Sequence, residues 1–305
     1  MICELAIISG KGGTGKTSVA ASFAALAEKK ILVNCDVDAA DLHLILNPHV
    51  IHREDFVGGK KARIISEQCI GCGKCVEVCR FDAISLSGPA NDVIAKTYRI
   101  DEFACEGCGL CSHFCPNEAV DFSARVSGEW YVSETRHGPL VHARLGVAKE
   151  NSGKLVATVR RKAREIAEEQ ELGLIIIDGS PGIGCPVISS ITGTTMVLVV
   201  TEPSFSGLHD LDRVADLTHH FGIPTAVCVN KSDINPEITS DIRSHCQERG
   251  LDMLGEIRYD TKVTRAQIEG KSTVEYSGSI AAQDIRTLWN VVVRRLQATA
   301  DDKKG

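Results

Sequence analysis

The sequence has few aromatic residues and no excess of positive charge. Aromatics make up 5% of the 305 residues, and 34 Lys and Arg are outnumbered by 40 Asp and Glu, giving a formal net charge of −6. A protein without a broad basic surface binds nucleic acid weakly, so we expect no nucleic-acid partner. No apolar run approaches the roughly 20 residues of a membrane span, and no basic leader precedes the first apolar run. We therefore expect a cytoplasmic protein without a membrane partner.

Against this background, the sequence is rich in cysteine. It has 13 cysteines, together with 43% hydrophobic and 24% charged residues, which is the balance of a soluble globular protein. In the cytosol, thiols are kept reduced, so a cysteine count of this size indicates metal binding rather than disulfides. The length is sufficient for a full α/β core and a small second domain.

A glycine-rich segment near the N-terminus predicts a phosphate-binding loop. Residues 9–17 read Ser-Gly-Lys-Gly-Gly-Thr-Gly-Lys-Thr, between an apolar run at 5–8 and an alanine-rich helix expected over 18–30. Glycines let backbone N–H groups turn inward, and the helix N-terminus adds partial positive charge. Lys16 would reach the β- and γ-phosphates, and Thr17 would bind Mg²⁺. A glycine turn that binds nothing is the alternative. The predicted phosphate-binding residues are Gly10, Lys11, Gly12, Gly13, Thr14, Gly15, Lys16, Thr17 and Ser18.

Two cysteine motifs with the same spacing lie in the middle of the chain. Residues 69–79 and 105–115 each read C-x₂-C-x₂-C-x₃-C, and Asp82-Ala83-Ile84 is echoed by Glu118-Ala119-Val120. Three thiolates on one tight loop can hold three corners of a 4Fe–4S cluster, and the fourth cysteine ligates the other cluster. Zinc is the rival, but zinc sites draw on pairs of ligands rather than triplets plus one. The predicted ligand sets are Cys69, Cys72, Cys75 and Cys115 for one cluster, and Cys105, Cys108, Cys111 and Cys79 for the other.

This cysteine pattern is similar to that of bacterial two-cluster ferredoxins. Arg80 stands where those proteins usually carry proline, so a positive charge near one cluster can separate the two reduction potentials. The polar stretch from His49 to Ala62 is interpreted as a linker into this inserted unit.

With Lys11 near its start, the glycine loop resembles that of a known family of ATPases. Lys-Gly-Gly-Thr-Gly-Lys-Thr resembles the deviant loop of the MinD/ParA/nitrogenase-iron-protein ATPases. In that family, two subunits face each other across their nucleotides, and the early lysine reaches the partner's phosphates. The resemblance also covers Asp36-Val37-Asp38, which follows a strand expected at 31–33. It implies that Asp36 supports Mg²⁺ and that Asp38 orients the attacking water.

Two later segments complete the predicted nucleotide site. An apolar run at 174–177 ends in Asp178, the Walker B pattern, which would hold Mg²⁺ through water. Asn230-Lys231-Ser232-Asp233 reads literally as the guanine motif Asn-Lys-x-Asp, but the resembled ATPases carry a similar step with the asparagine on adenine. We predict ATP, with Asn230 and Lys231 at the nucleotide, and guanine reading through Asp233 stays open.

The remaining cysteines and the last helix are expected to have structural roles rather than to bind a ligand. Cys185 follows the Walker B run, where the nitrogenase iron protein has a cluster-sharing cysteine, but no second ligand is evident and we expect a small buried thiol. Cys3, Cys35, Cys228 and Cys246 are expected to be the same. The helix expected over 280–298 carries one apolar face, which we expect to pack on the sheet rather than on a membrane.

These features predict an α/β protein with a mostly parallel sheet flanked by helices, and a small inserted α+β ferredoxin domain. The expected domains are 1–60 and 126–305 for the ATPase and 61–125 for the insert. The predicted function is ATP hydrolysis, with Lys11, Lys16 and Asp38 as catalytic residues, coupled to one-electron transfer. The cofactors are ATP or ADP, Mg²⁺ and two 4Fe–4S clusters. The partners are a second copy or a paralogue, and a redox or metal-cofactor protein. An iron–sulfur scaffold or carrier is the main alternative, followed by a spatial organiser of the MinD/ParA kind.

Overall fold

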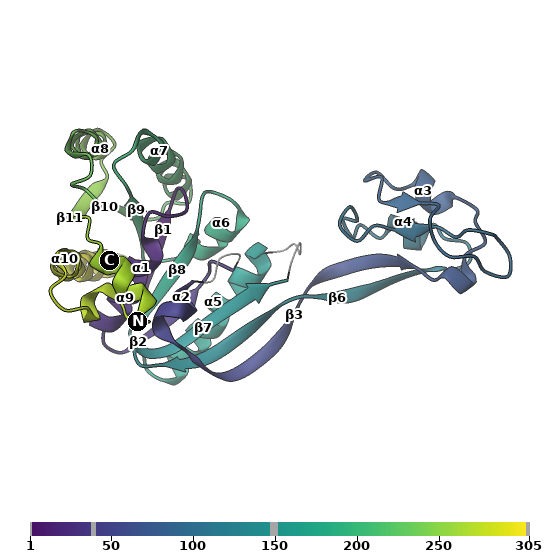
Figure 1. Ribbon diagram of the computed structural model, residues 1–305, viewed down its shortest axis with the longest axis horizontal. Helices are drawn as coiled ribbons and strands as arrows, with labels where there is room; N and C mark the ends of the chain where they lie inside the picture. The colour runs from purple at the N-terminus through teal and green to yellow at the C-terminus, as the bar shows by residue number, and fades with distance from the viewer. Residues whose placement is uncertain (1, 38–40, 147–151, 303–305) are drawn as a thin grey trace. The chain divides into compact units, whose positions relative to one another are not determined.

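The computed structural model describes residues 2–37, 41–146 and 152–302 (Figure 1). The chain divides into two compact units. The large unit comprises Met1–Glu54, Trp130–Leu145 and Ser152–Gly305, and the cysteine unit comprises Asp55–Glu129 and Gly146–Asn151. The insert expected at 61–125 lies within the cysteine unit, whose limits at 55 and 129 fall inside two long strands.

A mostly parallel sheet is the framework of the large unit, as predicted. In the described residues the sheet has nine strands in the order β11-β10-β9-β1-β8-β2-β7-β6-β3. The neighbouring strands from β11 to β7 are all parallel. The strands are β1 (Cys3–Ser9), β2 (Lys30–Asn34), β3 (His49–Ile64), β6 (Val120–Thr135), β7 (Gly138–Leu145), β8 (Leu174–Pro181), β9 (Met196–Thr201), β10 (Thr225–Asn230) and β11 (Asp252–Ile257).

Helices cover both faces of this sheet (Figure 1). Successive residues of a strand point to opposite faces, so Leu5 and Ile7 of β1 share one core cluster with residues of the first and last helices. Phe23 and Trp289 meet in that cluster with ring centroids 4.7 Å apart. The helices of this unit are α1 (Lys16–Leu26), α2 (Leu42–Leu46), α5 (Ser152–Glu169), α6 (Cys185–Ile191), α7 (Phe205–His220), α8 (Pro236–Glu248), α9 (Lys262–Ile268) and α10 (Ile280–Asp302), with a 3₁₀ turn η2 (Thr273–Glu275).

The last helix packs as the sequence predicts. Its apolar residues Ile285, Leu288, Trp289, Val292 and Leu296 are all buried, and α10 contacts α1 and β11. No helix in the described part of the chain is long and apolar enough to cross a membrane.

The prediction of a linker at 49–62 is wrong, because this stretch is strand β3. Residues 49–55 are all exposed, including Val50 and Ile51, and one-sided burial begins only at Phe56, so the first half of the strand has no apolar face that marks it in the sequence. Its backbone joins the sheet beside β6, and His52 and Trp130 lie with ring centroids 5.1 Å apart. Sheet pairing, rather than burial, fixes this segment.

The cysteine unit shows the sequence duplication in its backbone. It contains η1 (Ser66–Gln68), α3 (Lys74–Glu77), α4 (Leu110–His113) and an antiparallel pair, β4 (Ile84–Ser85) with β5 (Arg99–Ile100). Gly73 and Gly109 precede the two short helices with φ of 78° and 77°. Asp82 and Glu118, the echoed acidic residues, also share a left-handed backbone, with φ of 49° and 52°. The two motifs therefore fold as matched halves.

Candidate functional site: a phosphate-binding loop and two cysteine-lined cavities

The glycine loop joins β1 to α1, and two of its glycines are required by close contacts. A Cβ on Gly10 would lie 2.3 Å from Cβ of Asp210 on α7. Gly15 has φ +90°, and a Cβ there would lie 2.2 Å from Nδ2 of Asn230. Only glycine fits both positions without displacing a neighbour. The loop is thus held against α7 and the end of β10 as a preformed turn.

Lys16 lies in a buried cluster of charges at the carboxyl ends of β2 and β8. Its Nζ is 2.8 Å from Oδ1 of Asp178 and 3.4 Å from Oδ2 of Asp36. Burial disfavours the charged form of this lysine, but the two carboxylates outweigh burial and raise its pKa above the ordinary value. The three residues predicted from separate motifs are therefore brought together, with Thr17 Oγ1 3.4 Å from the same ammonium.

The cavity beside this cluster is about 760 Å³, within the usual size range of small-molecule sites. It is lined by residues 12–18 and by Ser9, Asp36, Asp41, Leu44, Ile45, Pro181, Gln267 and Ile268. Among the residues that the structure describes, Thr14 Oγ1 and Asp178 Oδ2 are buried without a hydrogen-bond partner. Buried polar atoms normally have a partner, so these two oxygens fit a polar ligand or a hydrated cation. Asp38, the predicted water-orienting residue, lies outside the described residues.

Lys11 is held by its own chain. Its Nζ lies 2.8 Å from Oε1 of Glu202, and it donates to Ser206 Oγ at 2.7 Å and to Ser204 Oγ at 3.2 Å. Ser204 is also the N-cap of α7, where it accepts a hydrogen bond from Gly207 N. Lys11 is not among the residues that line the cavity.

Asn230 and Lys231 brace the glycine loop from the end of β10. Asn230 Nδ2 donates to the Thr14 carbonyl at 2.7 Å, and Lys231 Nζ donates to the Gly13 carbonyl at 3.1 Å. Asp233, the residue of the guanine alternative, accepts a hydrogen bond from Tyr259 N at 2.6 Å. This backbone bond gives Asp233 a structural role at the loop after β11.

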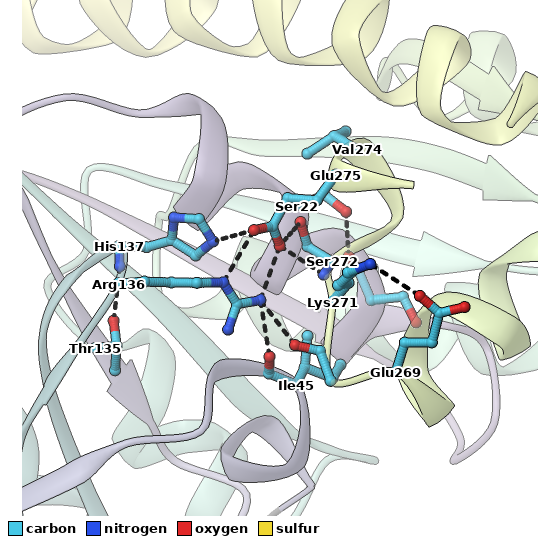
Figure 2. A network of polar contacts seen from close by, with 12 residues as sticks. Ser22, Ile45, Thr135, Arg136, His137, Glu269, Lys271, Ser272, Val274 and Glu275 are labelled. Carbon is cyan, nitrogen blue, oxygen red and sulfur yellow. Dashed lines mark hydrogen bonds and ion pairs between the residues drawn. The ribbon is translucent and has the colours of Figure 1, made fainter. Parts of the chain in front are cut away.

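The far wall of the cavity is tied together by one arginine, shown in Figure 2. Arg136, in the turn between β6 and β7, donates to the carbonyls of Ile45 (3.0 Å) and Gly270 (2.9 Å). It also binds Glu275 through both carboxylate oxygens, at 2.9 and 2.8 Å. Burial raises the pKa of Glu275, but hydrogen bonds from Arg136 and Ser272 outweigh it and hold that pKa far below its ordinary value. The guanidinium thereby links α2 and the α9–η2 segment.

The sequence-based prediction missed Glu202 and the wall residues Leu44, Ile45, Gln267 and Ile268. Glu202 directly follows the apolar strand β9, and ligands of parallel α/β sheets bind beyond the carboxyl ends of the strands, so its position after an apolar run is a signal that could have found it. The wall residues lie on short helices without a motif, and only the folded chain brings them to the loop.

The cysteine unit has two small cavities, each with a volume of about 20 Å³. Cys69, Cys72 and Cys75 line one of them together with Cys115 from the other motif. The second cavity is lined by Cys105, Cys108, Cys111 and Cys79. Each cavity is therefore lined by the four cysteines of one predicted ligand set, and their role as cluster ligands stays a prediction.

Two of the cysteines that line these cavities have thiols with a raised pKa. Burial, together with the neighbouring Cys69 and Cys72, raises the pKa of Cys75 to about 11. Burial also raises the pKa of Cys111. Crowded buried thiols resist ionisation unless a cation is bound, because a coordinating thiol loses its proton to the metal. Within 2–37, 41–146 and 152–302, no three or more His, Cys, Asp or Glu side chains are grouped closely enough to hold a metal ion.

Outside these cavities, the cysteines behave mostly as expected. Cys35, Cys228 and Cys246 are buried and Cys3 is partly buried. The prediction of a buried thiol at Cys185 is wrong, because Cys185 is exposed at the first residue of α6. The turn before α6 leaves it at the surface, which the glycine-rich sequence around it could not determine.

The parallel sheet, the glycine loop between β1 and α1 and the buried Lys16–Asp178 pair define a P-loop nucleotide-binding protein. More specifically, the chain belongs to the CobQ/CobB/MinD/ParA nucleotide binding domain family, which it matches over residues 5–274. Two uncharacterized proteins of Methanocaldococcus jannaschii are similar to it. One is 37% identical over 245 residues, 77% of this chain and 80% of the relative. The other is 26% identical over 282 residues, 90% of this chain and 92% of the relative.

Solved structures show the same fold. The septum site-determining protein MinD from Pyrococcus horikoshii, complexed with Mg-ADP, superposes with a TM-score of 0.58 at 17% identity, covering 98% of this chain and 99% of that one. At this identity the likeness establishes the α/β fold with its mostly parallel sheet.

Proposed function

We propose that this protein is an ATP-hydrolysing iron–sulfur protein in which nucleotide-dependent dimer closure is coupled to one-electron transfer to a partner protein. The observation that carries the proposal is the pair of cavities, each lined by three cysteines of one motif and one of the other. Their presence in a chain with a MinD/ParA-type phosphate loop supports two linked functions.

At the nucleotide, the roles follow from the charges around the loop. Lys16 would turn from its carboxylates to the β- and γ-phosphates, and Thr17, Asp36 and Asp178 would hold Mg²⁺ directly or through water. Asp178 Oδ2, buried without a partner, supports a hydrated cation at this place. Asp38 would orient the attacking water, and Lys11 from a second subunit would stabilise the charge that develops on the phosphates.

ATP is proposed over GTP because Asn230 and Lys231 already lie on the loop and Asp233 is engaged by Tyr259 N. The dimer would be formed with a second copy or with a paralogue.

At the cysteine unit, each set of four cysteines would hold one 4Fe–4S cluster, which supplies one-electron transfer when bound. A four-iron cluster takes one thiolate from each of four cysteines, which is the donor set of each cavity. Glycines with positive φ lie between the cysteines in both motifs, at 71, 73, 107 and 109. Such turns aim backbone N–H groups toward the cluster sulfurs, which tunes the reduction potential.

The test is a potentiometric titration of anaerobically purified protein, without nucleotide and with a slowly hydrolysed ATP analogue. Iron and acid-labile sulfide should each total about eight per chain, from two four-iron clusters. We expect the midpoint potentials to move by tens of millivolts on closure, since a tenfold change in a one-electron equilibrium is about 59 mV.

Stoichiometric zinc without visible absorption would refute the clusters, and identical potentials in both states would refute the coupling. Clusters that are lost to a chelator and handed to an acceptor protein would instead identify a carrier.

A further inference from the structure

The ammonium of Lys11 has all three of its N–H donors engaged within its own chain. A lysine ammonium carries three donors and no acceptor. Glu202, Ser204 and Ser206 each place an oxygen within 3.2 Å of Lys11 Nζ. Lys11 therefore has no donor left for a phosphate in this conformation. Any contact with a phosphate on a second subunit has to replace at least one of these three partners.

Glu202 is the charged member of this set, and it is shared. Its Oε1 faces Lys11 at 2.8 Å, and its Oε2 faces Lys231 at 3.0 Å. Burial raises the pKa of Glu202, but the hydrogen bonds from the two lysines outweigh it and lower the pKa below its ordinary value. Glu202 is therefore an anion at neutral pH, lying between the early lysine and the lysine that braces Gly13.

We propose that Glu202 is a positioning residue that holds Lys11 in a self-bound conformation, which ATP-dependent closure has to open. This inference rests on the proposed nucleotide-dependent dimer and states what regulates its closure. The Glu202 carboxylate favours the contacts of Lys11 within its own chain over the contact of Lys11 with a phosphate on the second subunit.

The exchange leaves no buried charge unpaired. When Lys11 leaves, Glu202 keeps its bond to Lys231, which in turn keeps its bond to the Gly13 carbonyl. Ser204 keeps its capping bond with Gly207 N. The Lys11 and Glu202 side chains are 30% and 22% exposed, so water can reach both during the change. A γ-phosphate, which carries up to two negative charges over its oxygens, attracts the ammonium more strongly than one carboxylate does, whereas ADP has no γ-phosphate.

The experiment measures the dimer dissociation constant by sedimentation velocity for wild type, Glu202→Gln, Lys11→Ala and the double variant. Each protein is saturated with the same slowly hydrolysed ATP analogue. Saturation is checked separately, so that differences in nucleotide affinity do not affect the measured dimer dissociation constant. Glu237→Gln, which removes an acidic side chain at the start of α8, is the matched charge control. We expect Glu202→Gln to tighten the dimer about fivefold or more, the usual lower range of such coupling.

The double variant distinguishes the positioning role from a general change in charge. Because Glu202 acts through Lys11, Glu202→Gln should give no tightening when Lys11 is already alanine, and Glu202→Asp should lie between wild type and Glu202→Gln. A dimer that is unchanged or weakened in Glu202→Gln overturns the proposal. Equal tightening in the Lys11→Ala background, or in Glu237→Gln, also overturns it.

The same series separates this proposal from the proposed function. If wild type stays monomeric and Glu202→Gln dimerises with the ATP analogue, the proposal is supported, because Glu202 then prevents closure in wild type. If both stay monomeric at saturating nucleotide, the proposal fails, whereas iron content and ATP hydrolysis, measured on the same samples, still test the proposed activities.

Discussion

The large unit and the cysteine unit are stabilised in different ways. The core of the large unit consists of fully buried aliphatic and aromatic side chains such as Leu5, Ile7 and Phe23 between a sheet and its helices. Of the eight buried residues that form the hydrophobic cluster of the cysteine unit, three are the cysteines Cys75, Cys105 and Cys111, and two more are alanines. Hydrophobic burial dominates the first unit, whereas the second places cysteines, the proposed cluster ligands, within its small core.

The largest effect that this comparison predicts is the response to iron removal. Without clusters, the cysteine unit has a small apolar core and crowded thiols, and metal binding in such small units supplies much of the folding free energy. We expect residues 55–129 to lose protection in hydrogen exchange and to become sensitive to protease after chelation and oxidation. The strands of the large unit should stay protected in the same sample. Unchanged protection of both cysteine motifs in iron-free protein would contradict the comparison.

A smaller effect is expected from Lys16→Ala in the large unit. This change leaves Asp178 and Asp36 buried without their cation, and removing one partner of a buried ion pair costs about 3–5 kcal/mol. The free energy of unfolding, measured by denaturant titration, should fall by about that amount, and nucleotide binding should be lost. Lys29→Ala, at an exposed position outside the site, is the control and should change stability little.

A third prediction tests the crossed ligand sets within the cysteine unit. Cys79 belongs by sequence to the first motif but lines the cavity of the second. Cys79→Ser should therefore damage the cluster held by Cys105, Cys108 and Cys111 and leave the other, so that about half of the iron and one electron-paramagnetic signal remain. Cys246→Ser, at a buried thiol of α8, should keep all the iron. Damage confined to the cluster of Cys69, Cys72 and Cys75 would show that each motif binds its own cluster.

The smallest effect concerns the base of the nucleotide. ATP should bind at least tenfold more tightly than GTP, which is about 1.4 kcal/mol. Isothermal titration of both nucleotides against wild type and Asp233→Asn measures this preference. Equal or reversed affinities, together with loss of GTP binding in Asp233→Asn, would identify Asp233 as a guanine reader.

The two units also differ in how far their sites follow from the sequence. The cysteines that line each cavity and the Lys16–Asp178 pair could be predicted, because the repeated cysteine spacing and the Walker B pattern indicate which side chains lie together. Strand β3 could not, since its exposed residues carry no alternation and only pairing with the sheet defines it.

The contacts of Lys11 and Arg136 also could not be predicted from the sequence. The partners of Lys11 lie more than 190 positions away, as the separations of 193 and 195 to Ser204 and Ser206 show. Arg136 bridges backbone carbonyls, which leave no trace in residue identity. Such long-range contacts depend on the assembled fold rather than on any local pattern.

The place where the cysteine unit interrupts the chain has a consequence for engineering. In the large unit, the chain leaves through β3 at Glu54 and returns through β6 at Trp130, and these strands are neighbours in the sheet. Neighbouring strand ends can be closed by a two-residue Asn-Gly turn. Residues 55–129 can therefore be excised as a cassette, giving a minimal nucleotide-binding protein, and foreign modules can be spliced in at the same point.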